Sequence, residues 1–175
     1  MSTSSSAMAS SLATVQPLGV ATLQDAIDWW ESYRQAGKTL VTTNGCFDLL
    51  HVGHLRYLQV ARQAGDALLV ALNTDASVNG LKPQTSGPPR PLVEEAERAE
   101  LLAALRCVDA VVLFNEDTPA NILTALKPDV HVKGSQYTPE TLPEAPLLAS
   151  LGTRLVLVPM VVGRSTSDLV AKIRQ

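Results

Sequence analysis

Short runs of consecutive apolar residues alternate along the chain with segments in which apolar residues recur every three or four positions. The clearest run, residues 67–72, is apolar throughout and predicts a strand that is buried on both faces of a sheet. Further strands are expected at residues 38–43, 108–114, 130–132 and 155–158. Five strands that alternate with helices predict a single doubly wound α/β domain with a parallel sheet.

Helices are expected between these strands. The first has Thr22 as its N-cap and ends at Gly37, and its apolar face consists of Leu23, Ala26, Ile27 and Trp30. Further helices are expected at residues 51–65, 93–105 and 117–126, and a last one opens within residues 163–167. Residues 138–152 are interrupted by proline and show no clear period.

Composition narrows the class of protein. A chain of 175 residues suits one domain with a sizeable core, and a net charge of −3 argues against a nucleic-acid partner. Two cysteines far apart in sequence suggest a reducing compartment, and no apolar run approaches a membrane span. We therefore expect a cytoplasmic protein, with residues 1–20 as a disordered leader and residues 21–175 as the domain.

The most informative stretch, residues 40–58, joins a predicted strand to a predicted helix through the turn at Asn44 and Gly45. Such a turn gathers free backbone N–H groups at the start of the helix, which suits phosphate. The spacing of His51 and His54 places both imidazoles on one face of the first helical turn. Gly53 lies between them and has no Cβ, so a ligand can approach the backbone. The stretch predicts a polyphosphate site.

Other chemistries are compatible with the same residue types. Cys46 is a possible nucleophile with His51 as its base. A second interpretation makes the two histidines only surface or helix-capping residues. A zinc site needs three or four ligands, and beyond this stretch only His131 and Cys107 remain as histidine or cysteine candidates.

Two further segments have the composition of phosphate-binding elements. Residues 80–91 are rich in proline and glycine and contain Lys82 and Arg90, which is typical either of a lid over phosphates or of an ordinary solvated loop. Residues 163–167, Gly-Arg-Ser-Thr-Ser, place hydroxyl groups and free N–H groups at the start of the last helix. Asp75 follows a predicted strand, at the edge where open α/β sheets bind ligands.

Residues 43–54, Thr-Asn-Gly-Cys-Phe-Asp-Leu-Leu-His-Val-Gly-His, resemble the signature of the cytidylyltransferase-like nucleotidyltransferases. The exact sequence of these residues is most similar to that of the ADP-heptose synthase branch of the family. The resemblance continues at residues 73–77, 81–82, 132–134 and 163–167. It implies a Rossmann-like sheet with strand order 3-2-1-4-5, Mg²⁺-dependent nucleotidyl transfer, and a homodimer.

The resemblance also implies roles for individual residues. It implies that His51, His54 and Lys82 are catalytic. Nucleotide-binding roles fall on Asn44, Gly45, Cys46, Phe47, Gly53, Gly163, Ser165 and Thr166. Substrate-binding roles fall on Asp48, Asp75, Arg90, Lys133 and Gln136. No direct protein ligand is expected for Mg²⁺, which the phosphates would hold.

The reaction expected from the resemblance transfers AMP from ATP to a sugar 1-phosphate, with heptose 1-phosphate as the acceptor, and releases pyrophosphate. No general base is required, because a phosphate monoester with a second pKa of about 6 is already an anion at pH 7. Ser135 and Gln136 replace the family's Gly-Asp and remove a carboxylate expected to face the sugar. Two alternatives stay open: another acceptor, such as glycerol phosphate with CTP or phosphopantetheine, and a non-catalytic nucleotide-binding module.

Overall fold

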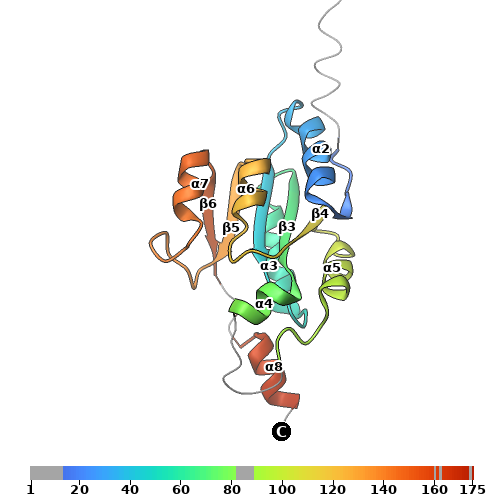
Figure 1. Cartoon of the computed structure of the whole chain (residues 1–175), viewed down its shortest axis with the longest axis vertical. Helices are drawn as coiled ribbons and strands as arrows, with labels where there is room; N and C mark the ends of the chain where they lie inside the picture. Colours follow the sequence, from blue (N-terminus) through green and yellow to red (C-terminus); the bar gives the residue numbers. More distant parts are fainter. Residues whose placement is uncertain (1–13, 82–88, 160, 162, 174) are drawn as a thin grey trace, which may run out of the picture.

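The structure, a computed structural model, describes residues 14–81, 89–159, 161, 163–173 and 175 of the chain. Its strands are β1 (Gly19–Ala21), β2 (Leu40–Gly45), β3 (Ala67–Asn73), β4 (Ala110–Phe114), β5 (Val130–Gly134) and β6 (Arg154–Val158). Its helices are α2 (Leu23–Arg34), α3 (Val52–Arg62), α4 (Asp75–Leu81), α5 (Glu95–Ala103), α6 (Ala120–Leu126), α7 (Ala145–Leu151) and α8 (Thr166–Ile173). Together they form an α/β domain around one sheet (Figure 1).

The sheet of the described residues is parallel and has the order β1-β4-β3-β2-β5-β6. The expected five strands in the order 3-2-1-4-5 are therefore wrong. The additional strand, β1, pairs Gly19–Ala21 with the beginning of β4. A strand this short has too little alternation to be recognised, and its partner lies far along the chain, so tertiary contact decides its conformation. Residues 14–20 of the segment assigned to the leader are thus described, whereas residues 1–13 lie outside the described part.

Two helices were also not expected from the pattern. Helix α4 directly follows β3, and helix α7 lies within residues 138–152, where prolines obscure the period. Helix α7 has a proline in its first turn and ends at Gly152, whose φ of 71° lies in the left-handed region. Both helices are seven residues long, too short for a reliable apolar repeat.

The alternation within β3 shows how the sheet is covered. Leu68, Val70 and Leu72 join one apolar cluster with residues of α3 and α5, whereas Ala67, Leu69 and Ala71 join another with residues of α2 and α6. Every residue of β3 is buried, as the uninterrupted apolar run predicts. Figure 1 shows α6 in front of the sheet and α3 behind it. In the described part of the chain, no helix is long and apolar enough to cross a lipid bilayer.

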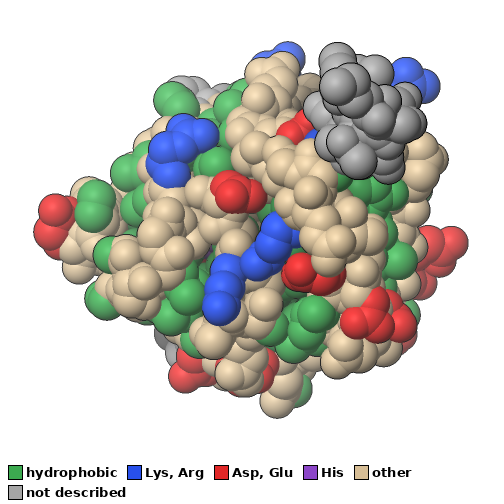
Figure 2. All heavy atoms as spheres, turned by 90° about the horizontal axis from the view of Figure 1, so that it is seen from above, with side chains coloured by type: hydrophobic (Ala, Val, Ile, Leu, Met, Phe, Trp, Pro, Cys, Tyr) green, Lys and Arg blue, Asp and Glu red, His purple; other side chains and the backbone are tan. Residues whose placement is uncertain are grey.

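Three aspartates align the beginnings of neighbouring strands. Asp66, Asp109 and Asp129 directly precede β3, β4 and β5. Their carboxylates accept hydrogen bonds at 2.8 Å from the backbone N–H groups of Thr39, Leu68 and Leu40, respectively. Figure 2 views the molecule from this end, where acidic and basic side chains are interspersed and no histidine is visible. This hydrogen-bonded frame occupies the amino ends of the strands, and open α/β sheets bind their ligands at the opposite, carboxyl ends.

At the other end of the sheet lie α4 and α8 (Figure 1). Strand β2 pairs with β3 on one side and with β5 on the other, and the chain reaches β5 only after β3 and β4 are complete. The boundary between β2 and β5 is therefore the topological switch point, outside which open α/β sheets bind their ligands.

Candidate active site

A pocket of about 440 Å³ opens at this switch point. Ten residues that the sequence assigned to the site line it, namely Asn44, Gly45, Cys46, Phe47, Asp48, His54, Arg90, Lys133, Gln136 and Thr166. They come from the ends of β2 and β5, from the beginnings of α3 and α8, and from the segments before α5 and after β5. The pocket is large enough for a small ligand. Lys82 lies outside the described residues.

The two histidines stack at the beginning of α3. Their ring centroids are 3.9 Å apart with an interplanar angle of 19°, and the ring of Phe47 meets His54 edge-on at 5.4 Å. The spacing thus brings both imidazoles together, as expected. His54 lines the large pocket, whereas His51 lines a separate, much smaller one beside α8.

His51 is the N-cap of α3. Its Nδ1 accepts hydrogen bonds from the backbone N–H groups of Gly53 at 3.1 Å and His54 at 3.4 Å. Burial, followed by the positive charge of Arg164, lowers the pKa of His51, so the neutral ring is favoured. Because Nδ1 accepts, the proton of the neutral ring lies on Nε2, which remains as a donor. The capping role and a phosphate-binding role are therefore compatible.

Gly53 is needed by the protein itself. A Cβ at this position would lie 2.8 Å from Cε1 and Nδ1 of His51 and 3.2 Å from the carbonyl oxygen of Arg164. The space next to Gly53, where a ligand was expected to approach the backbone, is thus occupied by the imidazole of His51 and by the segment that leads into α8. Glycine at this position lets α3 and α8 begin side by side.

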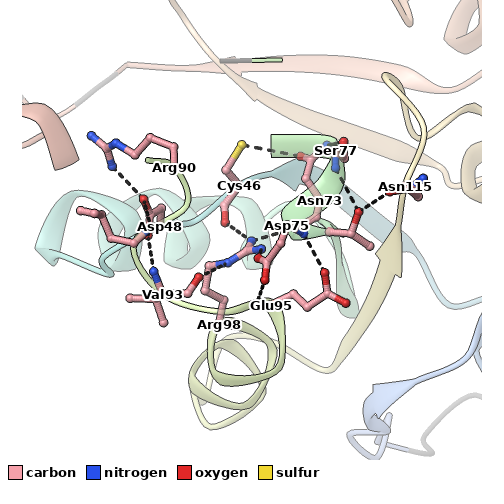
Figure 3. Close-up of polar contacts among 12 residues, drawn as sticks. Cys46, Asp48, Asn73, Asp75, Ser77, Arg90, Val93, Glu95, Arg98 and Asn115 are labelled. Atoms are coloured by element: carbon pink, nitrogen blue, oxygen red, sulfur yellow. Dashed lines mark hydrogen bonds and ion pairs between the residues drawn. The ribbon is translucent and has the colours of Figure 1, made fainter. Parts of the chain in front are cut away.

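The carboxylate of Asp48 is hydrogen-bonded by other groups of the protein. Its carboxylate accepts hydrogen bonds from Arg90 Nη1 at 2.8 Å, from Leu92 N at 3.0 Å and from Val93 N at 3.1 Å. Burial alone would raise the pKa of this carboxyl, but these hydrogen bonds outweigh it and hold the pKa below its usual value. Asp48 and Arg90 both line the pocket. The contact between them connects the turn before α3 to the segment before α5 (Figure 3).

Asp75 does not line the pocket but pairs with a buried arginine of α5. Arg98 is 1% exposed, and its Nη2 lies 2.7 Å from Asp75 Oδ1. Its other nitrogens donate to the carbonyl oxygens of Val93, Cys46 and Asn73 at 2.6–2.9 Å. Arg98 thereby joins the ends of β2 and β3 to α4 and α5, as Figure 3 shows. A charge buried to this extent requires such complete pairing.

Lys133, at the end of β5, is buried against three neighbours. Its Nζ donates to Asn44 Oδ1 at 2.7 Å, lies 3.3 Å from Glu144 Oε1, and lies 5.0 Å from the centroid of the Tyr137 ring. Burial lowers the pKa of this amine, although the nearby Glu144 opposes the shift. Because Asn44 is the penultimate residue of β2, this cluster spans the switch point and places a cation at the pocket wall.

The beginning of α8 contacts the turn before α3. Thr166 Oγ1 donates to the carbonyl oxygen of Asp48 at 2.7 Å, and Ser165 Oγ accepts from Asp168 N at 3.1 Å. Gly163, with a φ of 69°, makes the turn before this helix. Gly163 and Ser165 line the smaller pocket together with His51, whereas Thr166 lines the larger one. The structure thus brings together the two helix starts that the sequence singled out.

The helix-capping interpretation is correct for His51, whereas the nucleophile interpretation of Cys46 finds no support in these contacts. Cys46 Sγ lies 4.0 Å from Asn73 Oδ1, and Nδ1 of His51 is occupied by the helix backbone, so the two do not form a nucleophile–base pair. His131 is fully buried and bonds Thr42 Oγ1 at 2.8 Å. Among the described residues, no group of three histidine, cysteine or acidic side chains has the arrangement of a metal site.

Several residues of the site and its support received no role from the sequence, among them Glu144, Tyr137 and Arg98. Glu144 and Tyr137 line the pocket from the segment between β5 and α7, where the pattern was poorest. Arg98 carried two signals: it matches the arginine that the family resemblance places eight residues after Arg90, and it lies beside Ala99 and one turn before Leu102 on the buried face of α5. A charged residue on such a face predicts a buried ion pair. No comparable signal marks Glu144, since the next helix was itself not expected.

The parallel sheet, the pocket at its switch point and the paired helix starts define a class, that of α/β domains that bind phosphate-bearing ligands. A family model described as cytidylyltransferase-like matches residues 42–162, which include most of β2, all of α3 and Lys133. The chain belongs to the cytidylyltransferase-like family and is an enzyme of the nucleotidyltransferase class. The resemblance found in the histidine stretch is therefore confirmed.

Among curated proteins, the chain is similar to the bifunctional protein HldE of Syntrophotalea carbinolica, with 53% identity over 146 residues. The aligned part covers 83% of this chain and 29% of that protein. HldE of Geotalea uraniireducens is 56% identical over 138 residues, which cover 79% of this chain and 27% of the relative. The chain therefore spans less than a third of the length of these relatives.

Among solved structures, the lipopolysaccharide core biosynthesis protein from Thermoplasma volcanium GSS1 is 28% identical, with a TM-score of 0.56. The match covers 71% of this chain and 98% of that one. Pantoate-beta-alanine ligase from Francisella tularensis has a TM-score of 0.54 at 15% identity, covering 85% of this chain and 69% of that one. The second likeness shows the fold alone.

Proposed function

We propose that this domain transfers AMP from ATP to a sugar 1-phosphate, with heptose 1-phosphate as the acceptor, and releases pyrophosphate. One observation carries the proposal: His54 of α3, Lys133 of β5 and Thr166 of α8 line a single pocket at the switch point of the sheet. The choice of heptose rests on residues 43–54, and relatives named HldE that are about half identical support it.

In this reaction an oxygen of the sugar 1-phosphate attacks the α-phosphorus of ATP. The new P–O bond forms as the bond between the α-phosphorus and the oxygen that bridges to the β-phosphate breaks, and pyrophosphate leaves with that oxygen. The nucleophile is already an anion, so the protein has to align the groups and stabilise the developing charge. His54 would donate to phosphate oxygens in the large pocket, and Nε2–H of His51 would donate to phosphate oxygens in the smaller pocket beside α8.

Lys133 and the basic residues beside α8 would supply positive charge. Lys133 Nζ is held by Asn44 and faces Glu144, so its position is defined before any ligand binds. Arg164 and Lys172 line the smaller pocket with His51. Their positive charges would form charge-assisted hydrogen bonds with the β- and γ-phosphates. We propose that Lys82 covers the same phosphates, as the family motif implies.

Mg²⁺ is proposed to enter with ATP, bound by phosphate oxygens. The pocket fits this assignment, because Asp48 is already engaged by Arg90 and two backbone N–H groups, and Glu144 faces Lys133. When bound, the ion would act as a Lewis acid and template for the phosphates. The protein side chains would then orient the polyphosphate around it.

The test is a pyrophosphate-release assay of the wild-type protein. ATP, CTP and GTP are each combined with heptose 1-phosphate, other sugar 1-phosphates, glycerol 3-phosphate and phosphopantetheine, and products are identified by mass. The expected result is release with ATP and heptose 1-phosphate, yielding an ADP-sugar. Release only with CTP and glycerol 3-phosphate, or only with phosphopantetheine, would assign another acceptor. Nucleotide binding without release for any pair would indicate a binding module.

A further inference from the structure

The two central strands of the sheet separate at one residue pair. Strands β2 and β5 are paired as far as Thr43 and Val132, whereas β2 continues beside β3, and β5 beside β6, for two more residues. The residues beyond this pair that line the large pocket are Asn44, Gly45, Lys133 and Gly134. The pocket therefore opens where β2 and β5 separate, directly after Thr43 and Val132.

Tyr57 of α3 is hydrogen-bonded to both members of this last pair. Its hydroxyl oxygen lies 2.7 Å from Thr43 Oγ1, and the hydroxyl donates to the carbonyl oxygen of Val132 at 2.8 Å. Since the single phenolic proton is given to the carbonyl, Thr43 is the donor in the other hydrogen bond. Burial raises the pKa of Tyr57, so the phenol stays neutral at physiological pH. The hydroxyl is thus engaged within the protein and is not available for proton transfer.

Tyr57 connects two elements that carry groups on different walls of the pocket. His54 precedes Tyr57 by three residues, so both side chains lie on one face of α3, and both line the large pocket. Lys133 directly follows Val132, the residue whose carbonyl oxygen accepts from Tyr57. The hydroxyl therefore joins the helix that carries His54 to the strand that carries Lys133.

Packing alone does not require this hydroxyl. The ring of Tyr57 is partly buried against the apolar cluster between the sheet and α3, where phenylalanine would fill the same space. Thr43 is fully buried, so a polar pair stands where two apolar side chains would also pack. Apolar contacts are not directional, whereas hydrogen bonds fix distance and angle. The pair therefore fixes where α3 lies along the two strands.

We propose that Tyr57 is a positioning residue that fixes His54 relative to Lys133. It does so by holding α3 against the last paired residues of β2 and β5. The proposal rests on the proposed function for the roles of His54 and Lys133 toward the phosphates. These two groups come from different elements, and a misplacement of about 1 Å in an active site can cost about 10²-fold in rate.

The experiment compares Tyr57→Phe, which removes only the hydroxyl, with the control Thr153→Val. Thr153 is buried, and its hydroxyl also donates to a backbone carbonyl, that of Pro128 at 2.7 Å. It directly precedes β6 and therefore lies at the amino end of the sheet, away from the pocket. Both variants lose a hydroxyl that donates to a carbonyl oxygen, but only Tyr57 connects α3 to the pocket strands. Steady-state kinetics and the thermal midpoint are measured for each.

Tyr57→Phe should lower kcat about tenfold or more, while KM for ATP stays within about threefold, because a misplaced donor is felt mainly in the transition state. Thr153→Val should keep both constants near those of the wild type. In the His54→Ala background, Tyr57→Phe should change kcat by less than about threefold, since the donor that it positions is already absent. An effect of full size in that background would overturn the proposal.

Amide hydrogen exchange tests the positioning without turnover. In Tyr57→Phe, the amides of residues 53–58 should exchange about tenfold faster than in the wild type, as expected for the loss of about one hydrogen bond. Thr153→Val should leave these amides at wild-type rates. Thr43→Val, which removes the other partner, should act in the same direction and replaces Tyr57→Phe if the latter does not fold. Thr43→Ser, which keeps the hydroxyl, should restore wild-type exchange.

Two results would assign the hydroxyl of Tyr57 to stability alone and overturn the proposal. One is an equal change of kcat in Tyr57→Phe and Thr153→Val at similar thermal midpoints. The other is wild-type exchange of residues 53–58 in Tyr57→Phe. A wild type that releases no pyrophosphate would reject the proposed reaction, and the exchange measurement would then decide this inference by itself.

Discussion

At the scale of single residues, neighbouring side chains of one type have different tasks. His51 uses one ring nitrogen to cap α3, whereas His54 lines the large pocket between His51 and Phe47. The capping nitrogen is unavailable to a ligand, so the main donor to the transferring phosphate is expected to be His54. This division follows from position within the first turn, since only the N-cap side chain can reach the free N–H groups.

Replacement of His54 by alanine should therefore reduce kcat far more than it weakens ATP binding. The loss of one positioned donor to the transition state typically costs about 10²–10³ in rate. Steady-state kinetics of His54→Ala, with the thermal midpoint as a check of folding, test this. Gln59→Ala, an exposed position on the same helix, is the control and should remain near wild type. Near-normal turnover of His54→Ala would remove His54 from the mechanism.

Asp48 predicts a pH dependence of stability. Its folded-state pKa lies below its usual value of 3.8, so its contribution is fully present above about pH 4 and is lost as the pH falls through the lower folded value. Asp48→Asn should be less stable than wild type by about 1–3 kcal/mol at pH 7, and this difference should shrink below about pH 4. Urea unfolding between pH 7 and 3 measures it, with the exposed Asp28→Asn as control. A difference that does not vary with pH would contradict the assignment.

At the scale of elements, the beginning of α3 is fitted against the segment that leads into α8. Gly53 allows the imidazole of His51 to fold over the helix start, while Thr166 ties α8 to the carbonyl of Asp48. A side chain at position 53 would have to displace either the cap or the backbone at Arg164. The beginnings of the two helices are thus coupled through the space next to Gly53.

Gly53→Ala should be destabilising by about 1–3 kcal/mol and should lower activity, because its Cβ overlaps the ring of His51. Gly80→Ala is the matched control: its Cβ would have no neighbour within 4 Å, and it lies within α4. An alanine there should leave stability unchanged or raise it by about 0.5–1 kcal/mol. Chemical unfolding and pyrophosphate release compare the two. Equal stabilities of both variants would show that the helix start adapts to a methyl group.

At the scale of the whole molecule, one buried arginine connects the carboxyl end of the sheet. Arg98 donates to the carbonyl oxygens of Cys46, which follows β2, and of Asn73, the last residue of β3, and it pairs with Asp75 at the beginning of α4. The pocket floor therefore depends on a residue that does not line it. At the opposite end of the sheet, Asp66, Asp109 and Asp129 connect the amino ends of neighbouring strands in the same way.

Arg98→Met should reduce the free energy of unfolding by about 3–5 kcal/mol, because Asp75 loses its partner and buried carbonyls lose their donors. Arg106→Met, at an exposed position just beyond α5, is the control and should change stability little. Urea unfolding at neutral pH is the measurement. A loss below about 1 kcal/mol in Arg98→Met would mean that water replaces the guanidinium and that the junction is not buried in solution.

Much of the site was predictable because its residues are close in sequence. The stretch from Asn44 to His54 combines a strand end, a turn and a helix start, so local rules place its groups near one another. Asp48 shows the limit of such rules. It was expected to bind substrate, but its partners Arg90, Leu92 and Val93 are more than forty residues away, and only folding brings them together.

The sequence by itself determined the α/β class, the buried strand β3, the family and the two helix starts that meet at the pocket. These features depend on periodicity and on contiguous motifs, which report local backbone geometry and burial. The tertiary structure decided the edge strand β1, the pairing of Arg98 with Asp75, and the buried cluster of Lys133, His131 and Glu144. Each depends on segments distant along the chain, where desolvation and hydrogen-bond geometry, rather than local propensity, determine the outcome.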